Sequence, residues 1–473
     1  MSHSSTTPGP ARTDAVPARR EHGPRLTLVV LALAQAMLVI DLTVVNVALP
    51  VMSAELGIDP ALAGWAIAAY AVPFGGLLIL GGRLTDVFGA RRMLLAGLSV
   101  FTAASLVAGL APDAAWLVGA RAAQGVGAAL LSPAALATLL HRFQGPARNR
   151  ALGVWSAIGG AGAAVGVLLG GLLAGGPGWR WIFFINLPVG VLVALAVPAV
   201  VGTAVLGARP RGRIDVAGAL LATAGIAALV ASFTVGEIVE PWAGVAIALG
   251  GVALLAAFVG VERRAPEPLV RLGLLRSRPV ATGSLLMLVA TGLLVGGFVM
   301  FSFELQVGAG WGPIPTGLAF LPIALGVVLG AQLAGHAVGS VGARPVAAVA
   351  LLVGAAGLAL AAVAIATGLA EGVAVAGMSV AAAGLGAGFV CASTTTLARV
   401  DHAEAGTASG VLSSSHEIGS AVGVSAFSAI LASGSGVGFA TAAIVAAVAA
   451  LLAAVVVPSG TTMATGGAAR GMH

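Results

Sequence analysis

The stretch GGRLTDVFGARRMLL, residues 81–95, is a short polar turn between two apolar runs. Glycines bound it, and one acid and three arginines lie within it. A reduced copy, with Gly, Gly, Ala and Arg at the matching positions, returns 253 residues later at residues 335–344. Ordered matches at nearly one offset predict two homologous halves. Two more patterns recur in the same order, at offsets of 259 and 257 residues: 125–128 with 384–387, and 153–167 with 410–424.

The composition of the whole chain indicates a protein that is embedded in a membrane. Hydrophobic residues make up 59% of the sequence, charged residues only 8%, and the mean hydropathy is +1.06. A soluble chain of 473 residues cannot bury that much apolar surface. The formal charge of +6 does not indicate nucleic-acid binding, because the arginines lie in short turns and form no basic face interleaved with aromatic residues.

Apolar segments of spanning length recur about fourteen times, at roughly 20 residues each. The first, at residues 26–49, is too long for the apolar core of a secretory signal. We therefore expect an all-α polytopic membrane protein. The predicted spans are centred near Ala36, Ala71, Thr102, Ala128, Gly162, Leu192, Ala224, Gly251, Leu293, Val327, Ala356, Gly384, Val422 and Ala447.

Charge is segregated between alternate turns. If the N-terminus is cytoplasmic, the even-numbered turns hold almost all of the arginines and the odd-numbered turns hold mainly acids, with Arg180 as the exception. The positive-inside rule then predicts that both ends of the chain are cytoplasmic. The arginines of the even-numbered turns are Arg83, Arg91, Arg92, Arg142, Arg148, Arg150, Arg209, Arg211, Arg213, Arg263 to Arg278, Arg344 and Arg399.

The repeat offset exceeds six helices and their loops by about two spans of roughly 25 residues. We therefore expect two six-helix halves with two helices inserted between them, an arrangement typical of alternating-access carriers. We predict five segments along the chain: a disordered cytoplasmic tail at residues 1–25, a six-helix bundle at 26–207, the inserted pair at 208–265, a second six-helix bundle at 266–457 and a cytoplasmic tail at 458–473.

Several motifs resemble the major facilitator superfamily, and specifically its fourteen-helix drug:proton antiporter branch, over essentially the whole chain. They are IDLTVVNVALP at residues 40–50, the turn at 81–95, LVGARAAQGVGAALLSP at 117–133 and WRWIFFINLPVG at 179–190. The resemblance implies the major facilitator fold. It also implies a proton-driven exporter of lipophilic, drug-like or antibiotic compounds in the bacterial cytoplasmic membrane.

One motif departs from the family pattern. The glycine-rich stretch GGAGAAVGVLLGG, residues 159–171, resembles the antiporter motif of the fifth helix, but Val167 stands where the family usually has proline. A kink that depends on proline is therefore not expected. The small residues can still pack closely on a neighbouring helix.

Asp41 lies inside the first span, where a lone carboxylate costs several kcal/mol unless it is protonated, paired or facing water. It is therefore a candidate proton site. The resemblance assigns proton coupling to Arg121 as well, with Gln124 nearby. The alternatives are an Asp41 satisfied by the backbone or by Asn46, and a static pair between Asp41 and Arg121.

The turn at residues 81–95 resembles the cytoplasmic loop that latches the two halves of the family's members. That role falls here on Asp86, Arg91 and Arg92. An acid with arginines in a tight turn can make charge-assisted contacts that a rocking motion breaks. The alternative is a solvated loop that only sets the topology.

Two acids of the second half are further candidates for proton coupling or for cation recognition. Glu304 falls near the extracellular end of the ninth span and Glu417 falls inside the thirteenth, beside His416. The alternatives are an interfacial Glu304 and a Glu417 that pairs with His416 or an arginine. The residues predicted to line the substrate cavity are Asn46, Gln124, Trp155, Asn186 and Gln306.

The sequence carries no Cys/His metal spacing, no GxxxxGK[ST] phosphate loop and no large extramembrane domain, so we expect no enzyme activity, cofactor or metal. The expected partners are a lipophilic small molecule, either cationic or neutral, together with protons and the bilayer, and the chain is expected to act as a monomer. Two rival interpretations stay open: an exporter of a lipid or endogenous metabolite with the same fold, and a membrane sensor that transports nothing.

Overall fold

The computed structural model describes residues 23–201, 215–238, 240–266, 268–398, 400, 404–431 and 433–458. The tails predicted at both ends fall outside these residues, apart from the few positions that adjoin the first and last helices. Four arginines of the predicted arginine-rich turns also lie outside the described residues: Arg209, Arg211, Arg213 and Arg399.

The described residues form helices and no strand. The first group is α1 (Pro24–Leu56), α3 (Trp65–Phe88), α4 (Ala90–Gly109), α5 (Ala114–Arg142), α6 (Gly145–Gly175) and α8 (Asn186–Val200). The second group is α12 (Arg278–Phe303), α13 (Pro313–Val341), α14 (Ala343–Thr367), α15 (Glu371–Leu397), α16 (Ala405–Leu431) and α17 (Ser435–Val456). Between the groups lie α9 (Val216–Ile238) and α10 (Pro241–Glu262). The short elements are α2 (Pro60–Ala63), α7 (Trp181–Phe184), α11 (Leu272–Arg276) and a π-helix, η1 (Glu304–Gly308).

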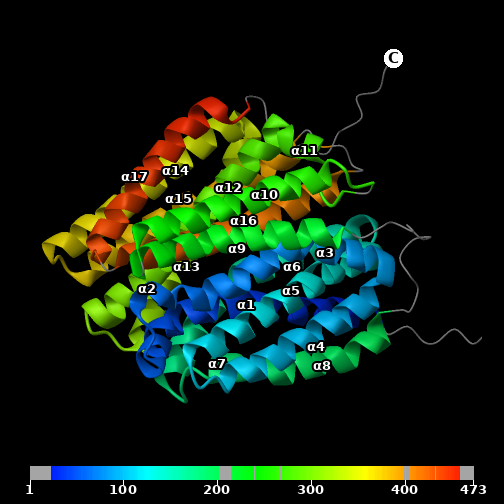
Figure 1. Cartoon of the computed structure of the whole chain (residues 1–473), viewed down its shortest axis with the longest axis horizontal. Helices are drawn as coiled ribbons and strands as arrows, with labels where there is room; N and C mark the ends of the chain where they lie inside the picture. Colours follow the sequence, from blue (N-terminus) through cyan, green and yellow to red (C-terminus); the bar gives the residue numbers. More distant parts are fainter. Residues whose placement is uncertain are drawn as a thin grey trace, which may run out of the picture.

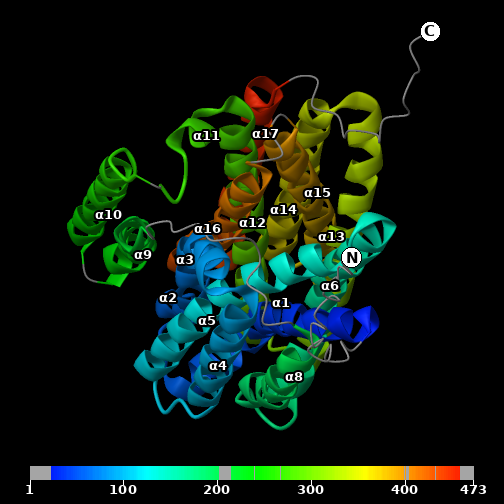
Figure 2. The same ribbon diagram turned by 90° about the vertical axis from the view of Figure 1, so that its right-hand side faces the viewer.

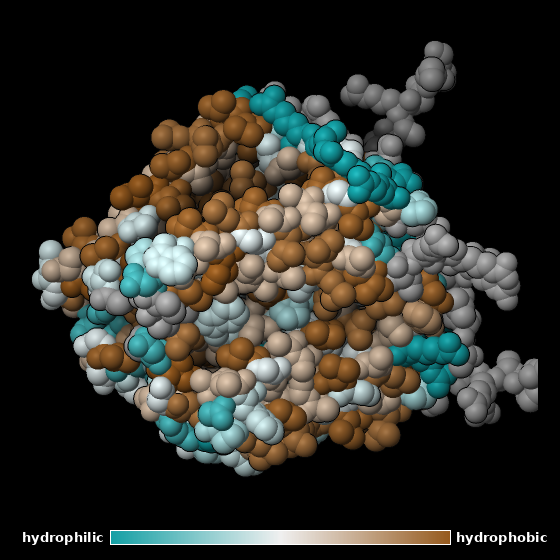
Figure 3. Space-filling model, in the orientation of Figure 1, coloured by the Kyte–Doolittle hydropathy of each residue, from teal (hydrophilic) through white to brown (hydrophobic). Residues whose placement is uncertain are grey.

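Every predicted span centre falls in one of the fourteen long helices. Within the described ranges, thirteen spans are long and apolar enough to cross a membrane. The fourteenth helix, α16, is less apolar because it carries His416, Glu417 and seven serines. Figure 3 shows hydrophobic side chains over most of the middle of one face, with hydrophilic ones gathered toward the two ends of the helices. The all-α polytopic fold is therefore confirmed.

The two groups repeat one packing scheme. α5 packs against α3 and α4, as α15 packs against α13 and α14, and the pair α1 with α6 matches the pair α12 with α16. The repeated turn adopts one conformation in both groups, since Gly89 and Gly342 have φ angles of 89° and 87°. Figure 1 shows the two groups side by side with their long helices running across the view, and Figure 2 shows the same groups turned by 90°.

Close helix contacts depend on glycine. A Cβ added at Gly81 of α3 would lie 1.9 Å from the carbonyl oxygen of Ala129 on α5, whereas one added at Gly82 would meet nothing within 4 Å. Gly171 on α6 similarly faces the backbone of Gly317 on α13, which joins the two groups. The small-residue face of α6 therefore packs closely without a proline, as the sequence predicts.

We expect Gly81→Ala to destabilise the protein by about 1–3 kcal/mol, because the new methyl group would force α3 away from α5. Gly82→Ala is the matched control, and it should leave stability unchanged or slightly raised, since alanine is the better helix former. The melting temperatures of the two purified variants in detergent check this. Equal melting temperatures would contradict the packing described.

The inserted helices lie at the side of the bundle. α9 packs against α10, α3 and α16, so it touches both groups, while α10 packs mainly against α9. Figure 2 shows α10 farthest from the bundle axis. The domain boundaries predicted from the sequence, after residues 25, 207, 265 and 457, remain predictions.

The arginine-bearing turns that the structure describes lie at one end of the bundle, where α3 ends and α4 begins, and we call this the arginine-rich end (Figure 1). The opposite, arginine-poor end holds the single exception to the charge segregation. Arg180 forms an ion pair there with Glu55, and its guanidinium lies 4.3 Å from the centre of the Trp179 ring. Trp179 Nε1 also donates a 2.7 Å hydrogen bond to Glu55. The exception is therefore neutralised by a neighbouring acid.

Candidate functional site

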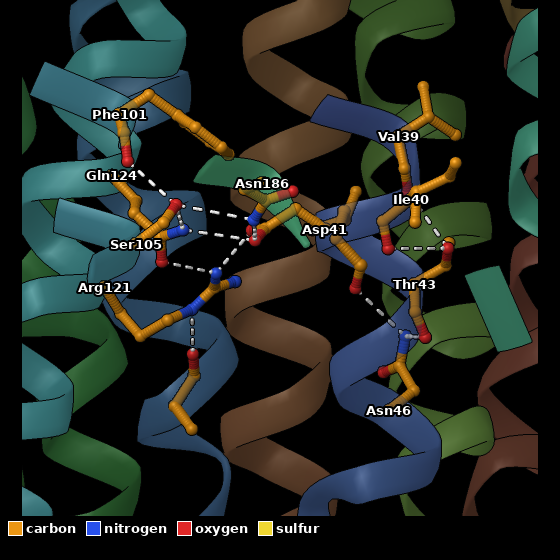
Figure 4. A network of polar contacts seen from close by, with 12 residues as sticks. Val39, Ile40, Asp41, Thr43, Asn46, Phe101, Ser105, Arg121, Gln124 and Asn186 are labelled. Atoms are coloured by element: carbon orange, nitrogen blue, oxygen red, sulfur yellow. Dashed lines mark hydrogen bonds and ion pairs between the residues drawn. The ribbon is translucent and has the colours of Figure 1, made fainter. Parts of the chain in front are cut away.

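A fully buried polar network lies inside the first group of helices. Asp41 of α1 and both Arg121 and Gln124 of α5 are 0% exposed, and Asn186 of α8 is 2% exposed. Figure 4 shows these side chains converging on the Asp41 carboxylate from three helices. Apolar helices can carry such residues only where each polar group finds a partner.

Three donors bind the Asp41 carboxylate. Arg121 Nη1 lies 2.5 Å from Oδ2, in an ion pair. Oδ1 accepts hydrogen bonds from Asn186 Nδ2 at 2.7 Å and from Gln124 Nε2 at 3.1 Å. One guanidinium and two amides thus surround the carboxylate.

Arg121 has partners that do not depend on Asp41. Its Nε donates to the Ala66 carbonyl oxygen at 2.8 Å, and its Nη1 donates to Gln124 Oε1 at 2.8 Å. The guanidinium carbon lies 4.5 Å from the centre of the Tyr70 ring. Arg121 Nη2 is buried without a hydrogen-bond partner among the described residues. The cation therefore keeps favourable contacts whether or not Asp41 carries charge.

Ser105 and Tyr70 belong to this network although the sequence analysis did not select them. Ser105 Oγ accepts a 2.8 Å hydrogen bond from Gln124 and donates to the Phe101 carbonyl oxygen. A serine in an apolar helix carries no distinguishing pattern. Tyr70 did carry a signal, because it is the single tyrosine of the chain and lies in the middle of a span.

The two acids of the second group occupy different surroundings. Glu304 opens the π-helix that follows α12, and it accepts a hydrogen bond from the Ser435 hydroxyl at the start of α17. Glu417 of α16 is 6% exposed, and its Oε1 lies 3.3 Å from His416 Nδ1. The structure does not bring either of them into contact with Asp41.

The predicted latch residues lie at the arginine-rich end. Asp86 is exposed near the end of α3, and Arg91 and Arg92 lie in the first turn of α4. Among the described residues, no ion pair joins Asp86 to either arginine. Arg83 of the same turn does reach toward the second group, and its Nη2 donates to the Pro268 carbonyl oxygen at 3.4 Å.

The residues predicted to line a cavity do not form one group. Gln124 and Asn186 belong to the Asp41 network. Asn46 donates to carbonyl oxygens of its own helix at 3.3 and 3.4 Å. Trp155 packs against the apolar core of the first group. Gln306 joins the two groups, because its Nε2 donates to the Val47 carbonyl oxygen at 2.8 Å.

Within the described ranges, no three His, Cys, Asp or Glu side chains lie close enough together to hold a metal ion. Cys391, the single cysteine, is buried in α15.

The amino-acid sequence is similar to those of antibiotic resistance and export proteins. The puromycin resistance protein pur8 of Streptomyces alboniger is 39% identical over 419 residues, which cover 84% of this chain and 80% of that protein. The lincomycin resistance protein of Streptomyces lincolnensis is 35% identical over 437 residues, covering 89% and 87%. The cephamycin export protein CmcT of Amycolatopsis lactamdurans is 35% identical over 417 residues, covering 86% and 85%.

Solved transporters share the fold. A D-xylose-proton symporter superposes with a TM-score of 0.65 at 16% identity and covers 92% of this chain and 98% of its own. A bacterial homologue of the lysosomal transporter Spinster gives 0.62 at 17% identity, covering 92% and 96%. The family model described as Major Facilitator Superfamily matches residues 31–424. With its repeated six-helix packing and these relatives, the chain belongs to the major facilitator superfamily of membrane transporters.

Proposed function

We propose that the chain is a proton-driven antiporter that exports lipophilic, drug-like or antibiotic compounds across the bacterial cytoplasmic membrane. Two observations support this. Relatives that cover most of the chain are named for resistance to puromycin and lincomycin or for export of cephamycin. The buried Asp41 and Arg121 pair supplies a carboxylate inside the membrane, which is the chemistry that proton coupling needs.

Asp41 exchanges the proton in this proposal, and its donors set the two states. Charged Asp41 ties α1 to α5 and α8 through Arg121, Gln124 and Asn186. A proton on Oδ2 would displace Arg121, which keeps its bonds to Ala66 and Gln124. These bonds reduce the cost of leaving the buried cation without its counter-ion.

Helix α1 links this carboxylate to the contact between the two groups. Val47, on α1, accepts the hydrogen bond from Gln306 of the second group. Val44, on the same helix, packs in one apolar cluster with Phe303 of α12. Loosening α1 by protonation of Asp41 would therefore disturb the contact that joins the groups, and this is how the proton would bias the conformational change.

In this proposal, the latch acts at the arginine-rich end of the bundle. The groups are joined at the arginine-poor end by Gln306 and by the contact of Gly171 with Gly317. Asp86, Arg91 and Arg92 are unpaired with one another here, and we propose that they engage when the arginine-rich end closes. Glu304 stays a predicted second proton site. Because one chain supplies both groups, we propose that it acts as a monomer.

We further propose that both termini are cytoplasmic, with the arginine-rich end inside. Reporter fusions after Asp113 and Glu371 should then read as external, and those after Arg148 and Arg344 as cytoplasmic. The pairing of Arg180 with Glu55 supports this orientation, because it removes the single unbalanced positive charge from the outer end. The reverse pattern of reporter signals would contradict the orientation.

Vesicle transport tests the function directly. Inverted membrane vesicles that contain the protein are energised to acidify their interior, and puromycin, lincomycin or ethidium is added. We expect at least one compound to collapse part of the pH gradient, and its accumulation to stop when an ionophore removes that gradient. Vesicles without the protein are the control. Accumulation that is unaffected by the ionophore would contradict proton coupling.

A further inference from the structure

Glu417 is a buried carboxylate that forms no ion pair with an arginine among the described residues and has His416 as its ionisable neighbour. Its Oε1 lies 3.3 Å from His416 Nδ1, while its Oε2 is buried with no hydrogen-bond partner among the described residues. A carboxylate at this depth is costly unless it is protonated or meets a cation. An ionised carboxylate only accepts hydrogen bonds, so the partner that it lacks is a donor.

The second group of helices offers no strong cation at this position. Its arginines Arg278 and Arg344 lie at helix starts, where both donate to carbonyl oxygens at the end of α17. The hydroxyl groups of Ser414 and Ser420, three residues to either side of Glu417, are also buried without partners. This face of α16 therefore presents several polar oxygens that the described residues leave unpaired.

The same face lies in the seam between the two groups of helices. A Cβ added at Gly75 of α3 would lie 2.7 Å from the Glu417 Cβ and 3.2 Å from the Ser414 carbonyl oxygen. α3 belongs to the first group and α16 to the second. The surroundings of Glu417 therefore come from both groups and must change when they move against each other.

The His416 ring lies next to the carboxylate, the Phe389 ring packs against His416, and both residues are partly exposed. The His416 and Phe389 rings meet edge to face with their centres 5.8 Å apart. The His416 side chain is 33% exposed, against 8% for the Glu417 side chain. A partly exposed aromatic surface beside a buried carboxylate is the arrangement that binds an organic cation with an apolar body.

We infer that Glu417, with His416 and Phe389, recognises the protonated amine of the exported compound. The inference rests on the proposed export function and adds a substrate class, the lipophilic amines. Glu417 Oε2 would accept a hydrogen bond from the ammonium group, and the two rings would contact the apolar body. Movement of α3 against α16 would then alter the site between binding and release.

Binding of a matched pair of fluorescent probes tests this inference. Dansylcadaverine carries a free amine that is protonated at neutral pH, and its N-acetyl derivative is neutral. Both are titrated at one fixed pH, without a gradient, against purified protein in nanodiscs. We expect the parent to prefer the amine, and Glu417→Gln to weaken amine binding about 10- to 100-fold. Binding of the acetylated probe should be unchanged.

Glu417→Asp keeps the charge and should retain most of the preference for the amine. Glu371→Gln makes the same chemical change at an exposed helix start and should bind both probes as the parent does. The inference would be overturned if Glu417→Gln weakened binding of both probes equally or of neither. It would also be overturned if the parent bound the amine and the acetylated probe with equal affinity. Loss of gradient-driven efflux of the acetylated probe in Glu417→Gln would also overturn it, because Glu417 would then act in coupling. Since binding is measured without a gradient, a failure of proton coupling leaves this test intact.

Discussion

Asp41→Asn is expected to reduce gradient-driven efflux to the level of vesicles that lack the protein. The amide keeps the size of the side chain but cannot exchange a proton, so the link between the gradient and the movement of α1 is lost. The measurement is gradient-driven accumulation of the compound in inverted vesicles that contain equal amounts of the parent or the variant. Downhill exchange of the compound should persist, because the variant removes coupling and leaves the rest of the pathway intact.

This variant also leaves Arg121 buried without its counter-ion, which costs about 3–5 kcal/mol in comparable pairs. Two controls separate coupling from stability. Asp41→Glu keeps a carboxyl group and should retain partial efflux. The double variant Asp41→Asn with Arg121→Gln removes both charges and should melt close to the parent, yet should still not couple. Efflux by Asp41→Asn that equals the parent's would place the proton site elsewhere.

Arg121→Ala should lower gradient-driven export strongly. Without the guanidinium, the Asp41 carboxyl group keeps only Gln124 and Asn186 as donors. Helix α1 also loses the ion pair that ties it to α5. Gradient-driven accumulation of the compound in inverted vesicles, at matched expression, measures the loss.

Arg121→Lys keeps the charge but loses the planar fork that reaches Asp41, Ala66 and Gln124 together, so an intermediate activity is expected. Arg148→Ala is the matched control, because it removes an arginine that is exposed at the start of α6. Accumulation by Arg121→Ala that equals the parent's would show that Arg121 does not act on the exchanging group.

Much of the fold could be predicted from the sequence. The hydropathy pattern located all fourteen long helices, and the repeated turn at residues 81–95 predicted the duplicated packing that Gly89 and Gly342 show in their backbone angles. Such features are local or periodic. Even α16, too polar to qualify as a span by composition, lies where the repeat predicts a helix.

The internal partners of the site could not be predicted in the same way. Sequence reasoning considered a pair between Asp41 and Arg121, and it assigned Gln124 and Asn186 to a cavity, whereas the structure places both amides on the carboxylate. Their distance along the chain is the reason: Asn186 lies 145 residues from Asp41, and no local pattern reports which helix faces which. Ser105 becomes recognisable only through the same tertiary packing.

The two groups of helices share one packing scheme but differ in their buried ionisable residues. At the repeat offset of 259, the position that matches Arg121 is Val380, and at the offset of 257 the position that matches Glu417 is Gly160. The duplicated scaffold thus holds a buried arginine–aspartate pair in one group and, in the other, a buried acid whose ionisable neighbour is a histidine. Under our proposals, the first group handles the proton and the second recognises the compound.

Proton release on substrate binding tests the central claim most directly. Antiport requires that the proton and the exported compound do not both stay bound when the transporter reorients. Purified protein in weakly buffered detergent solution is mixed with the best-transported compound of the vesicle panel, and a pH-indicator dye reports protons. The account predicts proton release by the parent and none by Asp41→Asn, while both bind the compound. Equal release by the two proteins would contradict the assignment of Asp41 as the coupling site.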